Sequence, residues 1–296
     1  MVAGGSLRVN ETLRYLGSRL VTTVLIVIGA MLLLFTLSSI VPGDPATTLF
    51  GPQATPELSR RFITEMGLDQ PVLVRLWRFF SNVAVGNLGV DVISGRPVTS
   101  LIREVIPYTL ILTFTALGFA ALVGIPLGFI LGRFAFLHSM AAPIISLLRP
   151  VSPLAWLPIG LMVFKSANPA AIWVIFISSI WPMIINTAVG VQRVPVDYLN
   201  VARVLNLSEW KVVTRILFPA TLPYVLTGVR LAIGVAWLVI VAAEMLTGGV
   251  GIGFWVWDEW NNLNVEHILI AIFVVGIVGL LLEQLLLLLA RRFNYA

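Results

Sequence analysis

The residues of this chain that could do chemistry are ionisable side chains within long apolar runs. Arg149, Arg230 and Glu244 each lie inside such a run, where placing a charge in hydrocarbon costs several kcal/mol. Two interpretations of the arginines stay open. In the first they line a path for an anion, and in the second they pair with helix ends or with the carboxylate of Glu283.

Aromatic and amide side chains in the same apolar runs could complete a cavity. Trp156, Asn186 and Trp237 are of this kind, although plain packing is the commoner role of such residues in a helix bundle. The candidate pathway residues are therefore Arg149, Trp156, Asn186, Arg230, Trp237 and Glu244.

No catalytic constellation can be assembled from the other residues. The chain has two histidines and no cysteine, so thiolate metal sites and disulfides are excluded. No serine has a histidine and an acid as companions, and neither an HExxH nor a Walker sequence occurs. The glycine-rich turn from Thr247 to Gly253 lacks the strand and helix that a phosphate loop needs. We therefore expect no enzymatic activity, and no cofactor or metal bound by this chain.

Composition indicates which elements must position these residues. Hydrophobic residues make up 58% of the 296 residues and charged residues only 11%, against roughly 25% charged in a soluble domain. Several apolar runs reach the ~20 residues that cross a hydrocarbon core as a helix. Because lipid offers the backbone no hydrogen-bond partners, these runs should be helices. We predict an all-α polytopic membrane protein with six transmembrane helices.

The predicted spans divide the chain into five parts. These are a cytoplasmic N-terminus (1–15), a first transmembrane helix (16–42), an external segment with short helices (43–106), a core of five transmembrane helices (107–292) and a C-terminal tail (293–296). The core contains a polar cytoplasmic loop, residues 193–221. In the external segment, Val72 to Val85 is typical of an amphipathic helix, either at the membrane interface or within a structured connector.

Basic residues indicate the orientation of the spans. Arg133, Arg203, Lys211 and Arg215 fall on the same side as both termini, and the positive-inside rule makes that side cytoplasmic. The same bias explains the net charge of +5 without a nucleic acid partner.

Glycine and proline spacing predicts how two of the core spans are built. Small residues at helical spacing let helices approach closely in lipid. The second span has Gly118, Gly124, Gly128 and Gly132. Prolines remove backbone donors and break helices. The third span, from about 140 to 164, has Pro150, Pro153 and Pro158.

A polar stretch from Asp197 to Pro219, here called the knob, separates two apolar runs. Asp197 can cap a helix running to Leu207, and a second helix from Glu209 to Phe218 would end at Pro219. The apolar face of the first helix is Val201, Val204, Leu205 and Leu207. Two short helices at an angle would project into the cytoplasm. The alternative is an interfacial helix on the inner leaflet, for which the basic and aromatic content is low.

The spacing within the knob resembles the cytoplasmic loop of permease subunits of binding-protein-dependent ABC importers. That loop has the form E-A-A, three residues, G, nine residues, I-x-L-P. Here Asn200-Val201-Ala202 is followed by Asn206 and then by Ile216 to Pro219. Asn200 stands where glutamate is usual and Asn206 where glycine is usual, and asparagine tolerates left-handed geometry.

The resemblance implies a type I ABC importer permease fold, and in that family the loop helix docks in a groove of the ATPase subunit. The residues that it assigns to ATPase coupling are Asp197, Asn200, Val201, Ala202, Leu205, Asn206, Leu207 and Pro219. The implied partners are two ATPase subunits that hold ATP and Mg, a second permease subunit, identical or related, an extracytoplasmic solute-binding protein, and membrane lipid. The implied location is the bacterial inner membrane.

The two halves of the chain resemble different branches of this family. Residues 149–262 resemble permeases for nitrate, bicarbonate, sulfonates and taurine, with RPVSPLAWLPIGLMVF and SSIWPMIINTAVGV among the matching runs. Residues 10–133 resemble dipeptide and oligopeptide permeases, with VPGDPA, GLDQPVLVRLWRFF and a long external segment. We expect import of a small oxyanion such as nitrate, with peptide import as the alternative. An ion channel or ion-driven carrier, a different class, would need neither the knob nor an ATPase.

Overall fold

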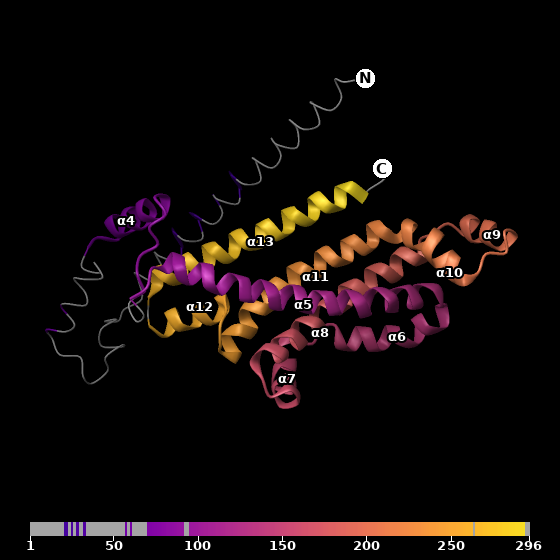
Figure 1. Cartoon of the computed structure of the whole chain (residues 1–296), viewed down its shortest axis with the longest axis horizontal. Helices are drawn as coiled ribbons and strands as arrows, with labels where there is room; N and C mark the ends of the chain where they lie inside the picture. The colour runs from indigo at the N-terminus through magenta and orange to yellow at the C-terminus, as the bar shows by residue number, and fades with distance from the viewer. Residues whose placement is uncertain are drawn as a thin grey trace, which may run out of the picture. The chain divides into compact units, whose positions relative to one another are not determined.

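The computed structural model of the chain describes residues 70–91, 95–262 and 264–293, with a few single positions between 21 and 60. This described part is built of helices and one isolated bridge between Val90 and Pro97, which confirms the all-α prediction (Figure 1). The longer helices are α4 (Val72–Ala84), α5 (Val98–Arg133), α6 (Ala135–Leu148), α8 (Ala167–Gln192), α11 (Phe218–Thr247) and α13 (Val265–Phe293). The shorter ones are α7 (Leu157–Phe164), α9 (Val196–Val204), α10 (Glu209–Val212) and α12 (Ile252–Asn261).

The chain forms two compact units. One contains residues 1–101 and 258–276, and the other contains residues 102–257 and 277–296. Helix α4 belongs to the first unit and has the amphipathic character predicted for 72–85, because Phe79 is buried while Trp77 is exposed. The candidate pathway residues and the knob all belong to the second unit.

Four of the described helices are long and apolar enough to cross a membrane. They cover Val98–Arg133, Ala167–Gln192, Glu209–Thr247 and Glu266–Leu288. Helix α6 and residues 153–164 meet at an angle of 94°, as a broken span or a re-entrant loop would. The break predicted for the third span is found at Pro150 and Pro153, whereas Pro158 lies within α7. The predicted N-terminus (1–15), first transmembrane helix (16–42) and most of 43–69 lie outside the described residues. The spans observed are compatible with the predicted six.

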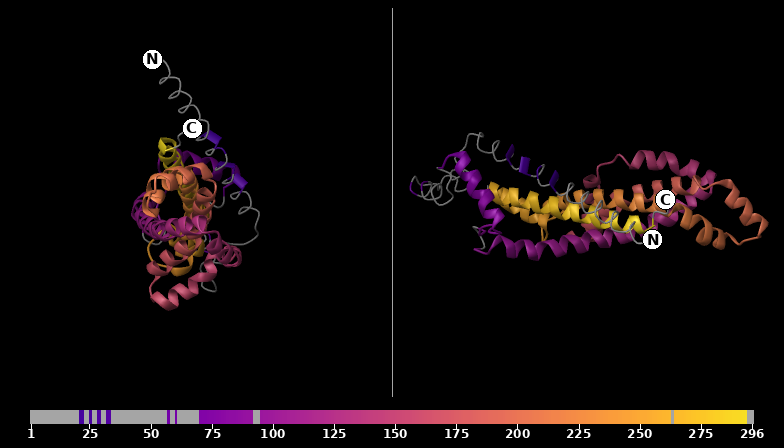
Figure 2. Two further views of the ribbon diagram at one scale, coloured as in Figure 1. Left: turned by 90° about the vertical axis from the view of Figure 1, so that its right-hand side faces the viewer. Right: turned by 90° about the horizontal axis from the view of Figure 1, so that it is seen from above.

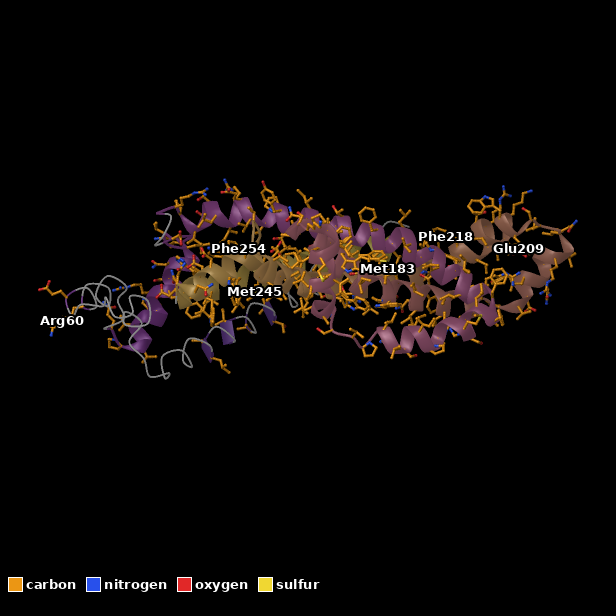
Figure 3. The ribbon with its side chains drawn as sticks, turned by 90° about the horizontal axis from the view of Figure 1, so that it is seen from below. Arg60, Met183, Glu209, Phe218, Met245 and Phe254 are labelled. Atoms are coloured by element: carbon orange, nitrogen blue, oxygen red, sulfur yellow. The ribbon has the colours of Figure 1, made fainter. Side chains whose placement is uncertain are left out.

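Helix α8 is the centre of the second unit. The most apolar stretch of α8 is 61% buried, whereas that of α5 is 28% buried and that of the span containing α11 is 44% buried. Helix α8 packs along α11, and α5 runs beside this pair (Figures 1 and 2). Met183 of α8 lies near the middle of the bundle, with Phe218 toward one end and Met245 toward the other (Figure 3). Helix α8, which carries side chains that face a cavity, is therefore contacted by both α5 and α11.

The close packing predicted for the second span is confirmed where α5 meets α8. A Cβ atom added to Gly128 would lie 2.6 Å from Cβ of Thr187, and one added to Gly132 would lie 2.6 Å from Cβ of Val191. Both distances are shorter than a carbon–carbon contact of about 3.5 Å, so a larger residue would force the helices apart. At Gly118, in contrast, no atom lies within 4 Å of the added carbon.

Replacing Gly128 by alanine tests this contact. The added carbon would lie 2.8 Å from the carbonyl oxygen of Ile184 as well as against Thr187, so α5 must shift. We expect a lower melting temperature in detergent, with a cost of about 1–3 kcal/mol. The matched control is Gly118→Ala, which should leave stability unchanged or raise it by up to about 1 kcal/mol through helix propensity. Equal melting temperatures for the two variants would show that the glycine contact does not hold these helices together.

Candidate functional site

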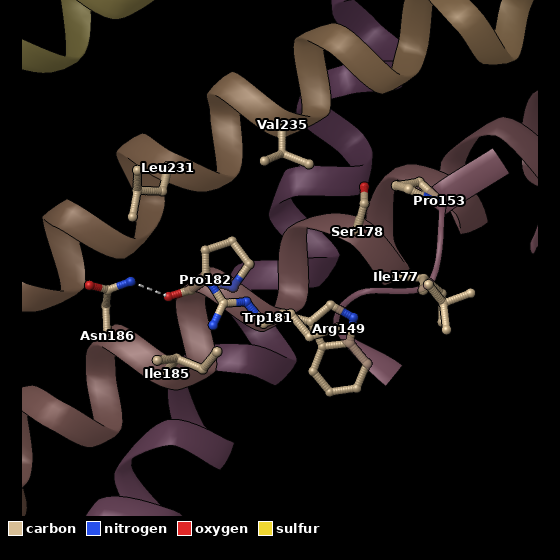
Figure 4. Close-up of a pocket in the computed structure, with 11 residues that line it drawn as sticks. Arg149, Pro153, Ile177, Ser178, Trp181, Pro182, Ile185, Asn186, Leu231 and Val235 are labelled. Carbon is tan, nitrogen blue, oxygen red and sulfur yellow. Dashed lines mark hydrogen bonds between the residues drawn. The ribbon is translucent and has the colours of Figure 1, made fainter. Parts of the chain in front are cut away.

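A break in the third predicted span opens a cavity in the second unit. Helix α6 ends at Leu148, and the chain turns through Arg149 and Pro150 into a short 3₁₀ segment, Pro153–Trp156. A cavity of about 310 Å³ lies between this break, α8 and α11 (Figure 4). Its polar and aromatic lining residues are Arg149, Ser178, Trp181 and Asn186. The rest of the wall is apolar, including Leu231 and Val235 of α11.

Arg149 supplies the charge of this cavity. Its backbone amide donates to the carbonyl oxygen of Ile145 at 2.9 Å and so completes the last turn of α6. Within the described part of the chain, its guanidinium has no hydrogen-bond or ion-pair partner. Arg149 also lines a second cavity of about 530 Å³ between α6 and α8. Because a guanidinium does not lose its proton in proteins, the positive charge is available to an anion in either cavity.

Helix α8 contributes polar groups to the same cavity. Ser178, Pro182 and Asn186 are spaced four residues apart, which puts them on one helix face. Pro182 has no N–H, so it cannot give the carbonyl of Ser178 its usual helical partner. The side-chain amide of Asn186 donates to the carbonyl oxygen of Pro182 at 2.8 Å (dashed line in Figure 4). The cavity face of α8 thus carries Ser178 and Asn186 among apolar and aromatic side chains.

This cavity contains two of the six predicted pathway residues, Arg149 and Asn186, and a separate cavity brings together Arg230 and Trp237. Sequence reasoning missed Ser178 and Trp181 as lining residues. The four-residue spacing about Pro182 is a signal that could have found Ser178, and Trp181 is its neighbour in the chain. Trp156 is half-buried at the end of the 3₁₀ segment and does not line this cavity.

Arg230 lies in a different place from Arg149. Its guanidinium forms an ion pair with Glu283 of α13 at 2.5 Å, and both side chains are about half exposed. The pairing interpretation is therefore confirmed for Arg230. Trp237 is buried against Gly279, and it lines a separate cavity of about 480 Å³ together with Arg230 and Glu283.

Glu244 ties α11 to the start of α12. Its carboxylate oxygen Oε2 accepts a hydrogen bond from the amide of Gly253 at 2.8 Å and one from the hydroxyl of Thr109 at 3.1 Å. The hydroxyl oxygen of Thr109 accepts from the amide of Ile252 at 3.0 Å. These bonds satisfy the first donors of α12, which would otherwise have no partner. A Cβ on Gly251 would lie 2.2 Å from Cδ of Glu244, so the turn closes tightly over the carboxylate.

The first helix of the knob, α9, ends in a Schellman motif. The amide of Leu207 donates to the carbonyl oxygen of Ala202, and the amide of Asn206 donates to that of Arg203, both at 3.0 Å. Asn206 has φ 48°, in the left-handed region that glycine normally occupies at this position. The left-handed geometry expected at Asn206 is confirmed, because asparagine is among the residues that adopt it most readily.

The knob has a buried inner face and an exposed apolar outer face. Ala202 is 2% exposed and packs in a cluster with Val212 and Leu217, against which Leu207 is partly buried. On the outer face, Val204 is 86% exposed, and Tyr198, Val201 and Leu205 are each more than half exposed. An apolar patch of this kind marks a binding surface.

Two predictions about the ends of the knob helices are wrong. Helix α9 begins at Val196 after Pro195, and Asp197 lies in its first turn without a capping hydrogen bond. Proline fixes φ near the helical value and lacks a donor, so it starts the helix in place of a cap. The second helix does not end at Pro219. Helix α10 continues through a π-helical turn, 213–217, directly into α11, where proline in the first turn is tolerated.

Two models of known protein families match most of the chain. The family model for the inner membrane component of binding-protein-dependent transport systems matches residues 124–295. A model for the N-terminal part of such membrane components matches residues 12–113.

Two groups of relatives each match 58% of the chain. A nitrate import permease of Synechocystis sp. (strain PCC 6803) is 55% identical over 175 residues, 58% of this chain and 64% of that protein. A bicarbonate transport system permease of Synechococcus elongatus (strain PCC 7942) is 48% identical over 176 residues, 58% of this chain and 63% of that protein. The chain spans less than two thirds of the length of these relatives.

A solved structure supports the fold. A chain of the inward-facing MetNI methionine ABC transporter superimposes with a TM-score of 0.53 at 16% identity, covering 65% of this chain and 93% of that one. Similarity at this level of identity shows the fold alone. The matches to the family models and the shared fold together place the protein: the chain belongs to the family of binding-protein-dependent transport system inner membrane components.

Proposed function

We propose that this chain is the permease subunit of an ATP-driven importer for a small oxyanion, with nitrate as the first candidate and bicarbonate or a sulfonate as related ones. The observation that carries the proposal is the guanidinium of Arg149, which lines an otherwise mainly apolar cavity and has no counter-charge among the described residues. The nitrate and bicarbonate permeases to which the chain is similar agree with an anionic solute.

The chemistry of the cavity suits a planar oxyanion. A guanidinium presents two parallel N–H donors that match two oxygens of one anion. Apolar walls from α11, such as Leu231 and Val235, reduce competition from water and strengthen the attraction. Asn186 has a second side-chain N–H to offer from α8, whereas the hydroxyl of Ser178 already donates to the carbonyl oxygen of Ile175 at 2.9 Å. One cation and weak polar neighbours would bind an ion without trapping it, as transport requires.

The knob supports a mechanism in which a partner protein that docks on the knob drives the movement of the chain. The exposed apolar side chains of Val201, Val204 and Leu205 fit a docking surface for an ATPase subunit, since anchors of an interface are exposed apolar residues before binding. In this proposal two ATPase subunits hold ATP and Mg, and a second permease subunit completes the pathway. A solute-binding protein delivers the ion from outside, and the knob and both termini are cytoplasmic.

Replacing Arg149 by glutamine removes the charge from the cavity and keeps a polar side chain. We expect nitrate uptake to fall by about tenfold or more, because a hydrogen bond to a charged group is worth about 1.5–3 kcal/mol. Arg149→Lys should retain part of the uptake, because it keeps the charge and loses the two-pronged geometry. The measurement is the initial rate of labelled nitrate uptake by proteoliposomes that contain the complete transporter and ATP.

The matched control is Arg230→Gln, because Arg230 pairs with Glu283 away from this cavity. It should keep most of the uptake. Full nitrate uptake by Arg149→Gln would contradict the proposal. Uptake of a dipeptide that nitrate does not inhibit would favour the peptide alternative, and uptake that persists without ATP and ATPase subunits would favour a channel or carrier.

Replacing Val204 by glutamate tests the knob. Val204 is 86% exposed, so the variant should fold normally, but a charge in the docked interface should weaken ATPase binding by about tenfold or more. We expect less ATPase subunit to co-purify with the permease and uptake to fall in parallel. Gln192→Glu adds the same charge at an exposed position outside the knob and should retain both. Normal co-purification and uptake with Val204→Glu would rule out this docking surface.

A further inference from the structure

Three ionisable side chains in the first unit lie together and buried. Asp91 belongs to the turn that the Val90–Pro97 bridge closes, Glu259 to α12 and His267 to α13. They are 7%, 1% and 6% exposed. Each offers one ligand atom, and these atoms lie within 4.8 Å of one another. None of them belongs to the cavity of Arg149 or to the knob, so the proposed function leaves the cluster unexplained.

The backbone around the cluster is built to hold it. The amide of Asp91 donates to the carbonyl oxygen of Arg96, and the amide of Gly95 donates to that of Asp91, both at 2.9 Å. A Cβ on Gly89 would lie 3.4 Å from Nε2 of His267, so the turn approaches the imidazole closely. Gly89 has φ 82°, which favours glycine. These contacts bring a carboxylate from one segment against two side chains from another.

The two groups that face Nδ1 of His267 require opposite protonation states of that nitrogen. Its Nδ1 lies 2.8 Å from Nδ2 of Asn264 and 3.1 Å from Oε2 of Glu259. The amide of Asn264 is oriented by its oxygen, which accepts from the backbone amide of His267 at 3.3 Å. If Nδ1 carries a proton, it faces the N–H donor of Asn264, and if it carries a lone pair, it faces the carboxylate oxygen of Glu259. A cation between Nδ1 and Oε2 would remove the repulsion between their lone pairs, and the side-chain N–H of Asn264 would then turn to another acceptor.

The distance between two of the three ligand atoms suits a small divalent ion. Ligand atoms at 2.0–2.1 Å from a tetrahedral ion are about 3.3 Å apart, close to the 3.1 Å between Nδ1 of His267 and Oε2 of Glu259. One imidazole with two carboxylates is a ligand set for first-row transition metals, whereas Ca²⁺ and Mg²⁺ prefer oxygen ligands alone. We propose that Asp91, Glu259 and His267 bind one divalent transition-metal ion, with Zn²⁺ as the representative, and that the ion joins residues 89–91 to α12 and α13.

Zinc content of the purified chain tests this proposal. The chain has no cysteine and only two histidines, so with a tag free of histidine the background binding is low. Full-length permease in detergent is stripped with EDTA, titrated with ZnCl₂ and assayed by elemental analysis after gel filtration. We expect about one zinc ion per chain, and a higher melting temperature with Zn²⁺ that Mg²⁺ does not reproduce. Wild-type protein that retains no zinc and shows no thermal shift would overturn the proposal.

Variants separate the site from non-specific binding. Asp91→Asn and Glu259→Gln lie in different segments and keep the side-chain shape, and each should weaken Zn²⁺ binding by about tenfold or more. Two control variants should bind zinc as the wild type does. Asp258→Asn removes the same charge from an exposed neighbour, and His138→Ala removes the other histidine. If zinc binding is lost with His138→Ala and kept with Glu259→Gln, the ion lies elsewhere. If either site variant fails to fold, the wild-type zinc content still decides the question.

Discussion

Close backbone approach onto α8 is the constraint on which the rest of the described second unit depends. In lipid, helices are not driven together by water, so packing of small residues must hold them. Helix α5 approaches at Gly128. From α11, a Cβ added to Gly228 would lie 3.0 Å from the carbonyl oxygen of Pro182 in α8. A Cβ added to Gly190 of α8 would lie 2.6 Å from the Cβ of Tyr224 in α11. Because both neighbours touch α8 at the backbone, the cavity wall that it forms has little freedom to move independently of α5 and α11.

Irregular backbone supplies the polar features of this packed bundle. Backbone polar groups at membrane depth must be satisfied within the protein or line a cavity. The break after α6 places Arg149 beside the cavity, and Pro182 leaves the carbonyl of Ser178 without its helical donor at the same place. Two unrelated interruptions thus meet at one cavity, which is why its mainly apolar lining includes a charged side chain and polar backbone.

The sequence was sufficient for features that depend on local chemistry. The lengths of the apolar runs predict the spans, and the backbone donors that Pro150 and Pro153 lack predict the break near them. The spacing of the family loop predicts the left-handed conformation of Asn206. It was insufficient where the outcome depends on distant partners. Arg149 and Arg230 look alike in sequence, and only the fold shows that Glu283 lies beside the second of them. Pro219 looked like a helix end because a sequence does not reveal the π turn, 213–217, that lets α10 continue into α11.

Helix α11 connects the two functional features directly. Leu217, at its start, is buried in the cluster that anchors the knob, and Leu231 and Val235 line the cavity with Arg149. The fourteen helical steps from 217 to 231 span about 21 Å, and α8 covers a similar length, about 20 Å, from Val191 to Ser178. Within the proposed function, a displacement of the knob would therefore reach the cavity along two helices fixed to each other at their backbones. The π turn is the irregular element in this connection, since such turns are rare within α-helices and frequent at functional sites.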